Sequence, residues 1–298
     1  MSEMKPGATQ PVGAINPTGP NPLQKYFRQP KIYMNLPSRG HWYPEGAIEM
    51  PEGNEVPVYA MTAKDELAFK TPDALLNGQS VVDVIQSCVP AIKDGWSTPS
   101  IDVDAILIAI RIATYGEKME IETKVPGSGT DRKFDLDLRQ LLDKYQGIEY
   151  DNNVDVKDMK IKLRPQDYRQ FTRTAMKTFE EQRIASVVSD SEISDEEKMT
   201  RFAQSFNTLT NITVDMVVTG IQSIQVGEEV VVDQKHIGEF IKNADKDFFS
   251  AITSHMESEK KKFDIEPFKV ETTADERQAG APESYDVPIT FDQSNFFG

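Results

Sequence analysis

The sequence is poor in the residues that disulfides and metal sites require. It contains one cysteine, Cys88, and three histidines among 298 residues. A single cysteine excludes an intrachain disulfide and every zinc site that needs several cysteines. Cys88 also lies in the apolar segment VIQSCVPAI, a context typical of a buried and inert thiol. We therefore expect no bound metal and no cofactor.

The sequence also lacks an apolar run long enough to span a membrane, and it does not open with a basic and apolar signal segment. Its 48 acidic and 33 basic residues give a formal net charge of −15. That charge repels phosphate backbones and anionic lipids at long range. The sequence therefore argues against partners that are nucleic acids or membranes, and we expect the protein to stay in the cytoplasm where it is made.

Composition divides the chain into three parts. Residues 1–24 contain five prolines among small and polar residues, which cannot bury enough apolar surface to offset the entropy of ordering. We expect a disordered N-terminal arm there. Residues 25–150 are predicted to form a first α+β half with an aromatic and proline-rich lead-in, and residues 151–298 a second, mainly helical half with a C-terminal hairpin and an aromatic tail.

Short matches recur in the same order in the two halves. A strand followed by a helix opens each half, and a small β-hairpin comes late in each. The matched pairs are Asp65 with Asp167, Phe69 with Phe171, residues 85–87 with 221–223, Ile101-Asp102 with Val232-Asp233, and the hairpin at 119–138 with the one at 268–292. Matches in a fixed order predict a tandem duplication. The predicted fold class is a helix-rich α+β protein made of two tandem related halves.

Each predicted hairpin resembles a zinc ribbon without its ligands. Neither turn contains a cysteine or a histidine, whereas tetrahedral zinc needs four such donors. Asp151, Asn153 and Asp155 imitate the start of a calcium loop, but Val156 replaces the required glycine and Lys162 the bidentate glutamate. We interpret residues 151–155 as a polar linker.

Periodicity and capping residues place the helices. The segment from Ile101 is apolar on nearly all sides and ends at Gly116, as expected of a buried core helix. Pro165 indicates the start of an amphipathic helix, and Ser194 with Glu197 forms a capping box ahead of the next. The apolar positions from Ile237 to Ile252 predict one further amphipathic helix, which ends at the lysine cluster 260–262.

The sequence contains few patterns that are typical of a catalytic site. The turn at 127–129 lacks the residues that complete a phosphate-binding loop, and the histidines at 41, 236 and 255 are too far apart for a local ligand motif. Many carboxylates could still supply an acid pair of the kind that lysozymes use. We expect no enzymatic activity, and a cell-wall hydrolase is the alternative.

Two aromatic clusters are candidate partner-binding surfaces. The first lies between prolines near the N-terminus, and the second closes the chain. Such residues either pack on the protein's own core or anchor an interface, because clustered aromatics bind efficiently in partner pockets. The candidate residues are Tyr26, Phe27, Tyr33, Trp42, Tyr43, Phe291, Phe296 and Phe297.

The run YFRQPKIYMNLPSRGHWYPEG at residues 26–46 and the run MTAKDELAFKTPDALLNGQSVVDVIQSCVPAIKDG at 61–95 resemble the baseplate hub family of T-even-type tailed bacteriophages. The aspartate and aromatics at the C-terminus resemble that family as well. This resemblance implies a hub subunit or hub assembly factor that binds other tail proteins, among them the tape-measure protein. It implies a location in the host cytoplasm during assembly, or in the virion baseplate.

Three functions are left open by the sequence. The first is the non-enzymatic hub component or chaperone implied by the resemblance, and the second is a hydrolase of the tail tip. The third is a generic adaptor that binds peptides unrelated to phage tails. A resident subunit and a departing chaperone are not separable at this level, although the charge and the flexible arm favour a soluble helper.

Overall fold

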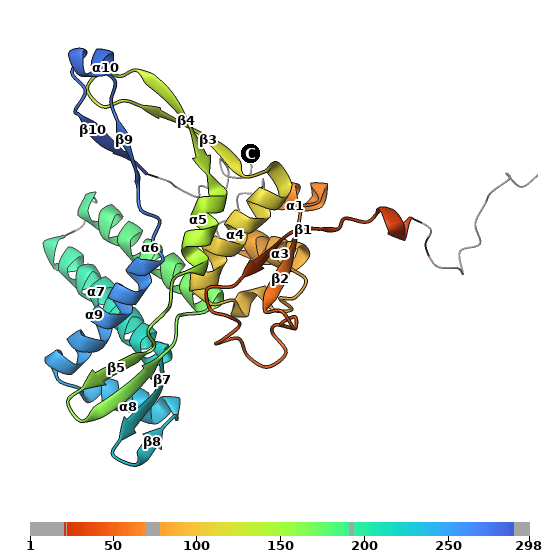
Figure 1. Ribbon diagram of the computed structural model, residues 1–298. Coiled ribbons are helices and arrows are strands. Elements are labelled where there is room, and N and C mark those ends of the chain that lie inside the picture. Colours follow the sequence, from red (N-terminus) through yellow and green to blue (C-terminus); the bar gives the residue numbers. More distant parts are fainter. Residues whose placement is uncertain (1–20, 22, 70–77, 191–193, 289–298) are drawn as a thin grey trace, which may run out of the picture.

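The computed structural model describes residues 21, 23–69, 78–190 and 194–288 of the chain. It is a mixture of helices and small antiparallel sheets, which confirms the α+β prediction. Figure 1 shows the first half on the right, the four-stranded sheet of the second half at the bottom, and two β-hairpins at the top.

The first half is built around helix α4. A two-stranded antiparallel sheet, β1 and β2, lies on one side of this helix, and helices α1, α3 and α5 pack around it. The bounds are β1 Pro30–Asn35, β2 Glu55–Tyr59, α1 Ala63–Phe69, α3 Gln79–Cys88, α4 Ser100–Tyr115 and α5 Leu138–Gln146, with short 3-10 turns at Gln24–Tyr26 and Gly95–Ser97.

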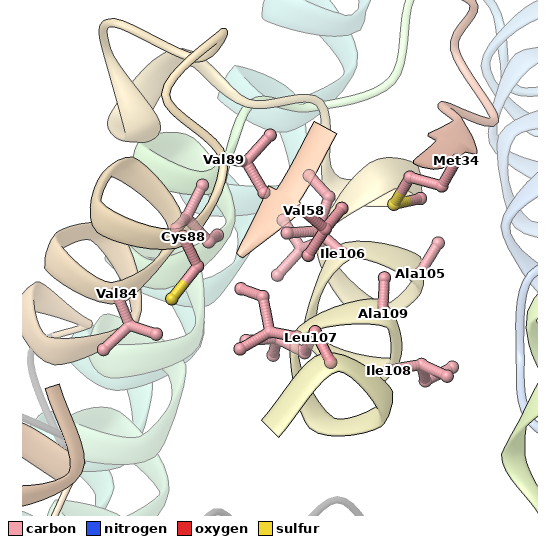
Figure 2. Close-up of a cluster of buried hydrophobic side chains, with 14 of the residues drawn as sticks. Met34, Val58, Val84, Cys88, Val89, Ala105, Ile106, Leu107, Ile108 and Ala109 are labelled. Carbon is pink, nitrogen blue, oxygen red and sulfur yellow. The ribbon is translucent and has the colours of Figure 1, made fainter. Parts of the chain in front are cut away.

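Helix α4 is apolar on nearly every side, and its burial follows from that composition. In Figure 2, side chains of α4 such as Leu107 face Val84 and Cys88 of α3, while Met34 of β1 and Val58 of β2 lie over the same cluster. The helix ends where predicted, at Gly116, whose φ of 93° suits a residue without a side chain.

The second half has its own core beneath a four-stranded antiparallel sheet with strand order β5-β6-β7-β8. Helices α8 and α9 supply most of the side chains that the sheet covers, among them Ile237, Phe248 and Ile252. The bounds are β5 Asn153–Val156, β6 Met159–Leu163, β7 Ile221–Val226, β8 Glu229–Val231, α8 Gln234–Asn243 and α9 Lys246–Lys262.

Two long helices and two β-hairpins extend from these cores. Helices α6 (Tyr168–Asp190) and α7 (Asp195–Gly220) pack against each other as a helical hairpin, and α7 begins at the predicted cap Ser194. The hairpin of β3 and β4 packs against that of β9 and β10 through a small cluster around Val125, Val270 and Tyr285. The remaining bounds are β3 Lys118–Lys124, β4 Asp131–Asp137, β9 Phe268–Glu271, α10 Ala274–Gln278 and β10 Ser284–Val287.

The contact between the two β-hairpins is close enough to require glycine. A Cβ added to Gly127 would lie 2.2 Å from the carbonyl oxygen of Gly280, and both residues have positive φ angles. Arg132 of β4 joins the same contact, because its guanidinium donates to the carbonyl of Glu271 at 2.9 Å and to Glu276 at 3.1 Å.

Several local predictions were wrong. Residues 85–87 lie in helix α3, whereas the identical residues 221–223 lie in strand β7, so this match in the proposed duplication does not hold. A tripeptide this short takes the conformation that its neighbours impose. Ile101-Asp102 does open a helix, because both residues lie in the first turn of α4, whereas Val232-Asp233 precedes α8 and supplies its N-cap.

The predicted helix across Ile237–Ile252 is in fact two helices. Asp245 separates them, because its carboxylate caps α9 at the amide of Phe248 and pairs with Lys157 at 2.5 Å. In the same way Asp167 caps α6, at the amide of Gln170, so that helix begins after the expected Pro165. The presumed linker at 151–155 also forms structure, since Asn153–Val156 pairs with β6.

Candidate interaction surface

The N-terminal lead-in is attached to the first half by Arg28. Its guanidinium donates to the backbone carbonyl of Ala60 at 2.6 Å, and to both the carbonyl and the hydroxyl of Ser87. Asp65 lies 3.6 Å from the same group and accepts from the Ser87 hydroxyl at 2.9 Å. The planar donor fork of arginine suits such a convergent set of acceptors, so Arg28 fixes the direction in which the lead-in leaves the core.

The single cysteine, Cys88, lies on the buried side of the contacts made by Arg28. Cys88 is fully buried and lies 3.8 Å from the Arg28 guanidinium. Burial, with a smaller contribution from the nearby carboxylate of Asp65, raises the pKa of its thiol to about 12. Cys88 is therefore a packed, protonated side chain at neutral pH, as expected from its apolar context.

Three of the candidate aromatics lie on the surface beside this anchor. Tyr26 and Phe27 come immediately before Arg28 and are 73% and 57% exposed, and Tyr33 is 56% exposed. Strand β1 alternates, so that Met34 points into the core while Tyr33 points outward. Arg28 and strand β1 therefore position these three aromatic rings on the solvent-exposed surface.

Tyr43 has a different environment. Its hydroxyl donates to Asp102 at 3.0 Å, and Asp102 also accepts from the backbone amide of Ser38 at 2.7 Å and from its hydroxyl at 2.5 Å. Burial raises the pKa of Asp102 to about 6 despite these donors, and burial beside Asp102 raises the pKa of Tyr43 well above its usual value. Tyr43 therefore ties its loop to α4.

Trp42 lines a cavity between the two halves. Its φ angle of 66° is left-handed, and its ring makes an edge contact with Tyr150 at a centroid distance of 5.4 Å. The cavity has a volume of ≈ 680 Å³ and is bordered by residues 41–44 and Tyr150 on one side and by Asn152, Arg164 and Gln222 on the other. Trp42 is thus half-buried and faces an open space that residues of both halves border.

A second cavity, of ≈ 360 Å³, lies between α4, α6 and α9. Asp104 borders it, together with Lys260 and Asp264. Burial raises the pKa of Asp104 to about 6, with a further upward contribution from Asp264 and an opposing one from Lys260. The buried hydroxyl of Tyr145 is near these carboxylates, and its pKa is raised by burial and by both.

The histidines are dispersed as the sequence indicated. The ring of His41 meets Trp42 edge-on, His236 lies 3.6 Å from Asp233, and His255 bonds to the carbonyl of Asp151 at 2.9 Å. In the described part of the chain, no group of three or more His, Cys, Asp or Glu residues is arranged to hold a metal ion.

A family model described as T4 bacteriophage base plate protein matches residues 43–278, which is most of the chain. The chain belongs to this family. It is therefore a structural component of a phage tail baseplate, and membership implies contact with other tail or baseplate proteins. No curated protein and no solved structure matches the chain.

Most of the aromatic candidates of this baseplate protein lie outside the range that the family model matches. Tyr43 begins the matched range, whereas Tyr26, Phe27 and Tyr33 precede it. Phe291, Phe296 and Phe297 lie outside the residues that the structure describes, so their role stays a prediction. Over the described residues of the baseplate protein, no helix is both long and apolar enough to cross a membrane.

Sequence reasoning missed two features of the baseplate protein. One is Arg28, whose neighbours in the sequence gave no sign of the acceptors that it reaches in α3. The other is the exposed face of the α6–α7 hairpin. Its signal was present, because Phe171, Met176 and Phe179 have helical spacing, but that pattern predicts only that one face is apolar and not which element covers it.

Proposed function

We propose that this baseplate protein is a non-enzymatic component or assembly factor of the tail hub, and that it holds other tail proteins through an aromatic surface. The observation that supports the proposal is the anchored exposure of Tyr26, Phe27 and Tyr33. Exposed aromatic rings on a rigid support are effective interface anchors, because they lose little entropy on binding and bury a large area. The candidate partner is a tail protein such as the tape-measure protein.

The electrostatics of the chain suit such a role. A net charge of −15 limits non-specific self-association and favours partners with a basic surface. Trp42 and the cavity beside it provide a second place where an extended segment of a partner could bind, since aromatic rings and Arg164 line it. Tyr43 is not part of the proposed surface, because its hydroxyl is engaged by Asp102.

The test is co-expression with hub and tape-measure proteins followed by size-exclusion chromatography. The wild type should co-migrate with one of them, and the triple variant Tyr26→Ser, Phe27→Ser, Tyr33→Ser should not. A matched control is Val230→Ser with Val232→Ser, which removes exposed apolar groups from the other half. Separate elution of the wild type, or unchanged co-migration of the triple variant, would contradict the proposal.

Two further measurements sharpen the role. Quantitative proteomics of purified virions distinguishes a resident subunit, present in stoichiometric amount, from an assembly factor that is absent from the particle. Incubation of the purified protein with cell-wall material tests the hydrolase alternative, and release of soluble fragments above the level of a buffer control would count against a non-enzymatic role.

A further inference from the structure

The four-stranded sheet of the second half has an apolar face and a polar face. Along strand β6, Ile161 and Leu163 are buried in the core that the sheet shares with α8 and α9, whereas Lys160 and Lys162 point to the opposite side and are exposed. Strands β5 and β7 pair with β6, so their alternating side chains follow the same division. The polar neighbours of the two lysines are Asn153, Asp155, Ser223 and Gln225.

Arg164 extends this row of basic side chains beyond the end of β6. Its backbone amide donates to the carbonyl of Gly220 at 2.8 Å, so the ladder continues and the side chain of Arg164 lies on the same side as Lys162. Its Nε donates to the carbonyl of Thr219 at 2.9 Å, which fixes the guanidinium in place. We call the surface of Lys160, Lys162 and Arg164, with their polar neighbours, the basic face.

Two hollows lie along the basic face. The first, of ≈ 360 Å³, is bordered by Lys160 and Lys162 and by polar residues of β5 and β7. The second is the cavity of ≈ 680 Å³ that Arg164 borders from the sheet and that Trp42 and Tyr150 border from the first half. Because Lys162 and Arg164 are two residues apart on one side of the chain, the two hollows adjoin.

The basic face differs in charge from the rest of the chain. Among the described residues that border the two hollows, three are formally positive and only Asp155 is negative, which gives a local net charge of +2 in a chain of net charge −15. None of Lys160, Lys162 and Arg164 forms an ion pair with a described residue. The basic face therefore favours an anionic ligand, although the whole chain favours a basic one.

The spacing of the three cations matches an extended peptide. Side chains two residues apart on one side of a strand are about 7 Å apart, so a second extended chain with acidic side chains at every second position presents carboxylates at the same interval. Trp42 and Tyr150 lie at the Arg164 end, where they offer an apolar contact to a neighbouring residue of that chain. A long nucleic acid fits less well, because the net charge of −15 repels its phosphates.

We propose that the basic face binds an extended acidic segment of another tail protein. Alternate carboxylates of the segment pair with Lys160, Lys162 and Arg164, and an apolar side chain binds beside Trp42. Each exposed charge pair increases the affinity by at most about fivefold, so the contact is weak, and salt weakens it further. It goes beyond the hub binding proposed above, because it uses a different surface and a partner segment of defined charge.

Fluorescence anisotropy with a labelled synthetic peptide tests the proposal. The peptide has glutamates at three alternate positions followed by leucine, and the full chain is titrated to about 1 mM in about 0.1 M salt, where screening is moderate. The wild type should bind saturably. Lys160→Glu with Lys162→Glu should weaken binding by at least about tenfold, because two attractions become repulsions. Circular dichroism verifies that each variant is folded.

A matched control separates a local site from the effect of net charge. Lys235 and Lys242 are exposed on α8, which packs on the other side of the sheet, and neither forms an ion pair with a described residue. Lys235→Glu with Lys242→Glu changes the net charge by the same amount and should weaken binding by less than about twofold. Equal losses for the two double variants would overturn the proposal, and so would the absence of saturable binding by the wild type.

Two further probes test the chemistry of the ligand. A peptide of the same composition with three consecutive glutamates should bind at least about threefold more weakly, because it presents fewer carboxylates on one side; equal binding would overturn the extended arrangement. A single-stranded tetranucleotide that binds as tightly as the first peptide would overturn the choice of a protein segment. The variant Tyr26→Ser, Phe27→Ser, Tyr33→Ser should bind the peptide like the wild type, so a failure of hub binding is distinguishable from a failure of this site.

Discussion

Helices α4 and α7 both carry several large apolar residues, but they bury them to very different extents. Eleven of the sixteen residues of α4 are buried, whereas three of the twenty-six residues of α7 are. The first helix is the centre of a core, and the second offers much of its apolar surface to solvent. The comparison shows that apolar content sets how much surface a helix can bury, while the fold determines how much of that surface the chain itself buries.

The largest expected effect is in α4. Ile106 is completely buried beneath β2 and α3, so Ile106→Ala should lower the free energy of unfolding by about 3 to 4 kcal/mol through lost contacts and a new cavity. Denaturant unfolding monitored by circular dichroism measures this loss. The exposed Ile184→Ala on α6 is the matched control and should change the value by less than about 0.5 kcal/mol. Equal losses for the two variants would abolish the distinction between the helices.

Sequence predicted α4 well because an all-round apolar helix has few alternatives to burial. It predicted the caps at Gly116 and Ser194 for a similar reason, since these depend on neighbouring residues alone. The prediction of a single helix over Ile237–Ile252 was wrong. The chain is interrupted at Asp245, whose pairing with Lys157 is a contact between residues distant in the sequence. Tertiary partners also separate Tyr43 from Tyr26, because only Tyr43 reaches Asp102. Nothing in the sequence distinguishes these two tyrosines, so it could name the candidate aromatics but not say which of them are exposed.

The next effect concerns Asp104, a half-buried carboxylate of α4 that borders the cavity between α4, α6 and α9. The folded state raises the pKa of Asp104 from 3.8 to about 6, so between these values the folded chain binds the extra proton. The contribution of Asp104 to stability is therefore present below pH 3.8 and is lost as pH rises through about 6. Asp104→Asn removes this loss and should stabilise the protein at pH 7 by up to about 3 kcal/mol.

Unfolding measured from pH 4 to pH 7 checks this prediction. The Asp104→Asn variant should show a smaller decrease in stability with rising pH than the wild type, because its amide does not titrate. The exposed Asp135→Asn on β4 is the control and should retain the wild-type slope. An unchanged slope in the Asp104 variant would mean that water in the neighbouring cavity solvates the carboxylate fully.

A smaller effect is expected at the anchor of the lead-in. Arg28→Met keeps the apolar stem but removes the donors to Ala60 and Ser87, which should cost about 1 to 2 kcal/mol. Residues 24–29 should then exchange amide hydrogens and be cleaved by proteases faster, while α4 keeps its protection. The exposed Arg39→Met, which loses a surface pair with Glu149, is the control. Faster exchange throughout the first half would show that Arg28 supports the core as a whole.

The smallest effect on stability is expected at Phe206 of α7. Phe206→Ser removes an aromatic ring that is 70% exposed, so the unfolding free energy of the dilute monomer should change by less than about 0.5 kcal/mol. Denaturant unfolding of both proteins in dilute solution measures this change. A large loss in the dilute monomer would show that Phe206 packs within its own chain, and α7 would then differ from α4 in degree of burial but not in kind.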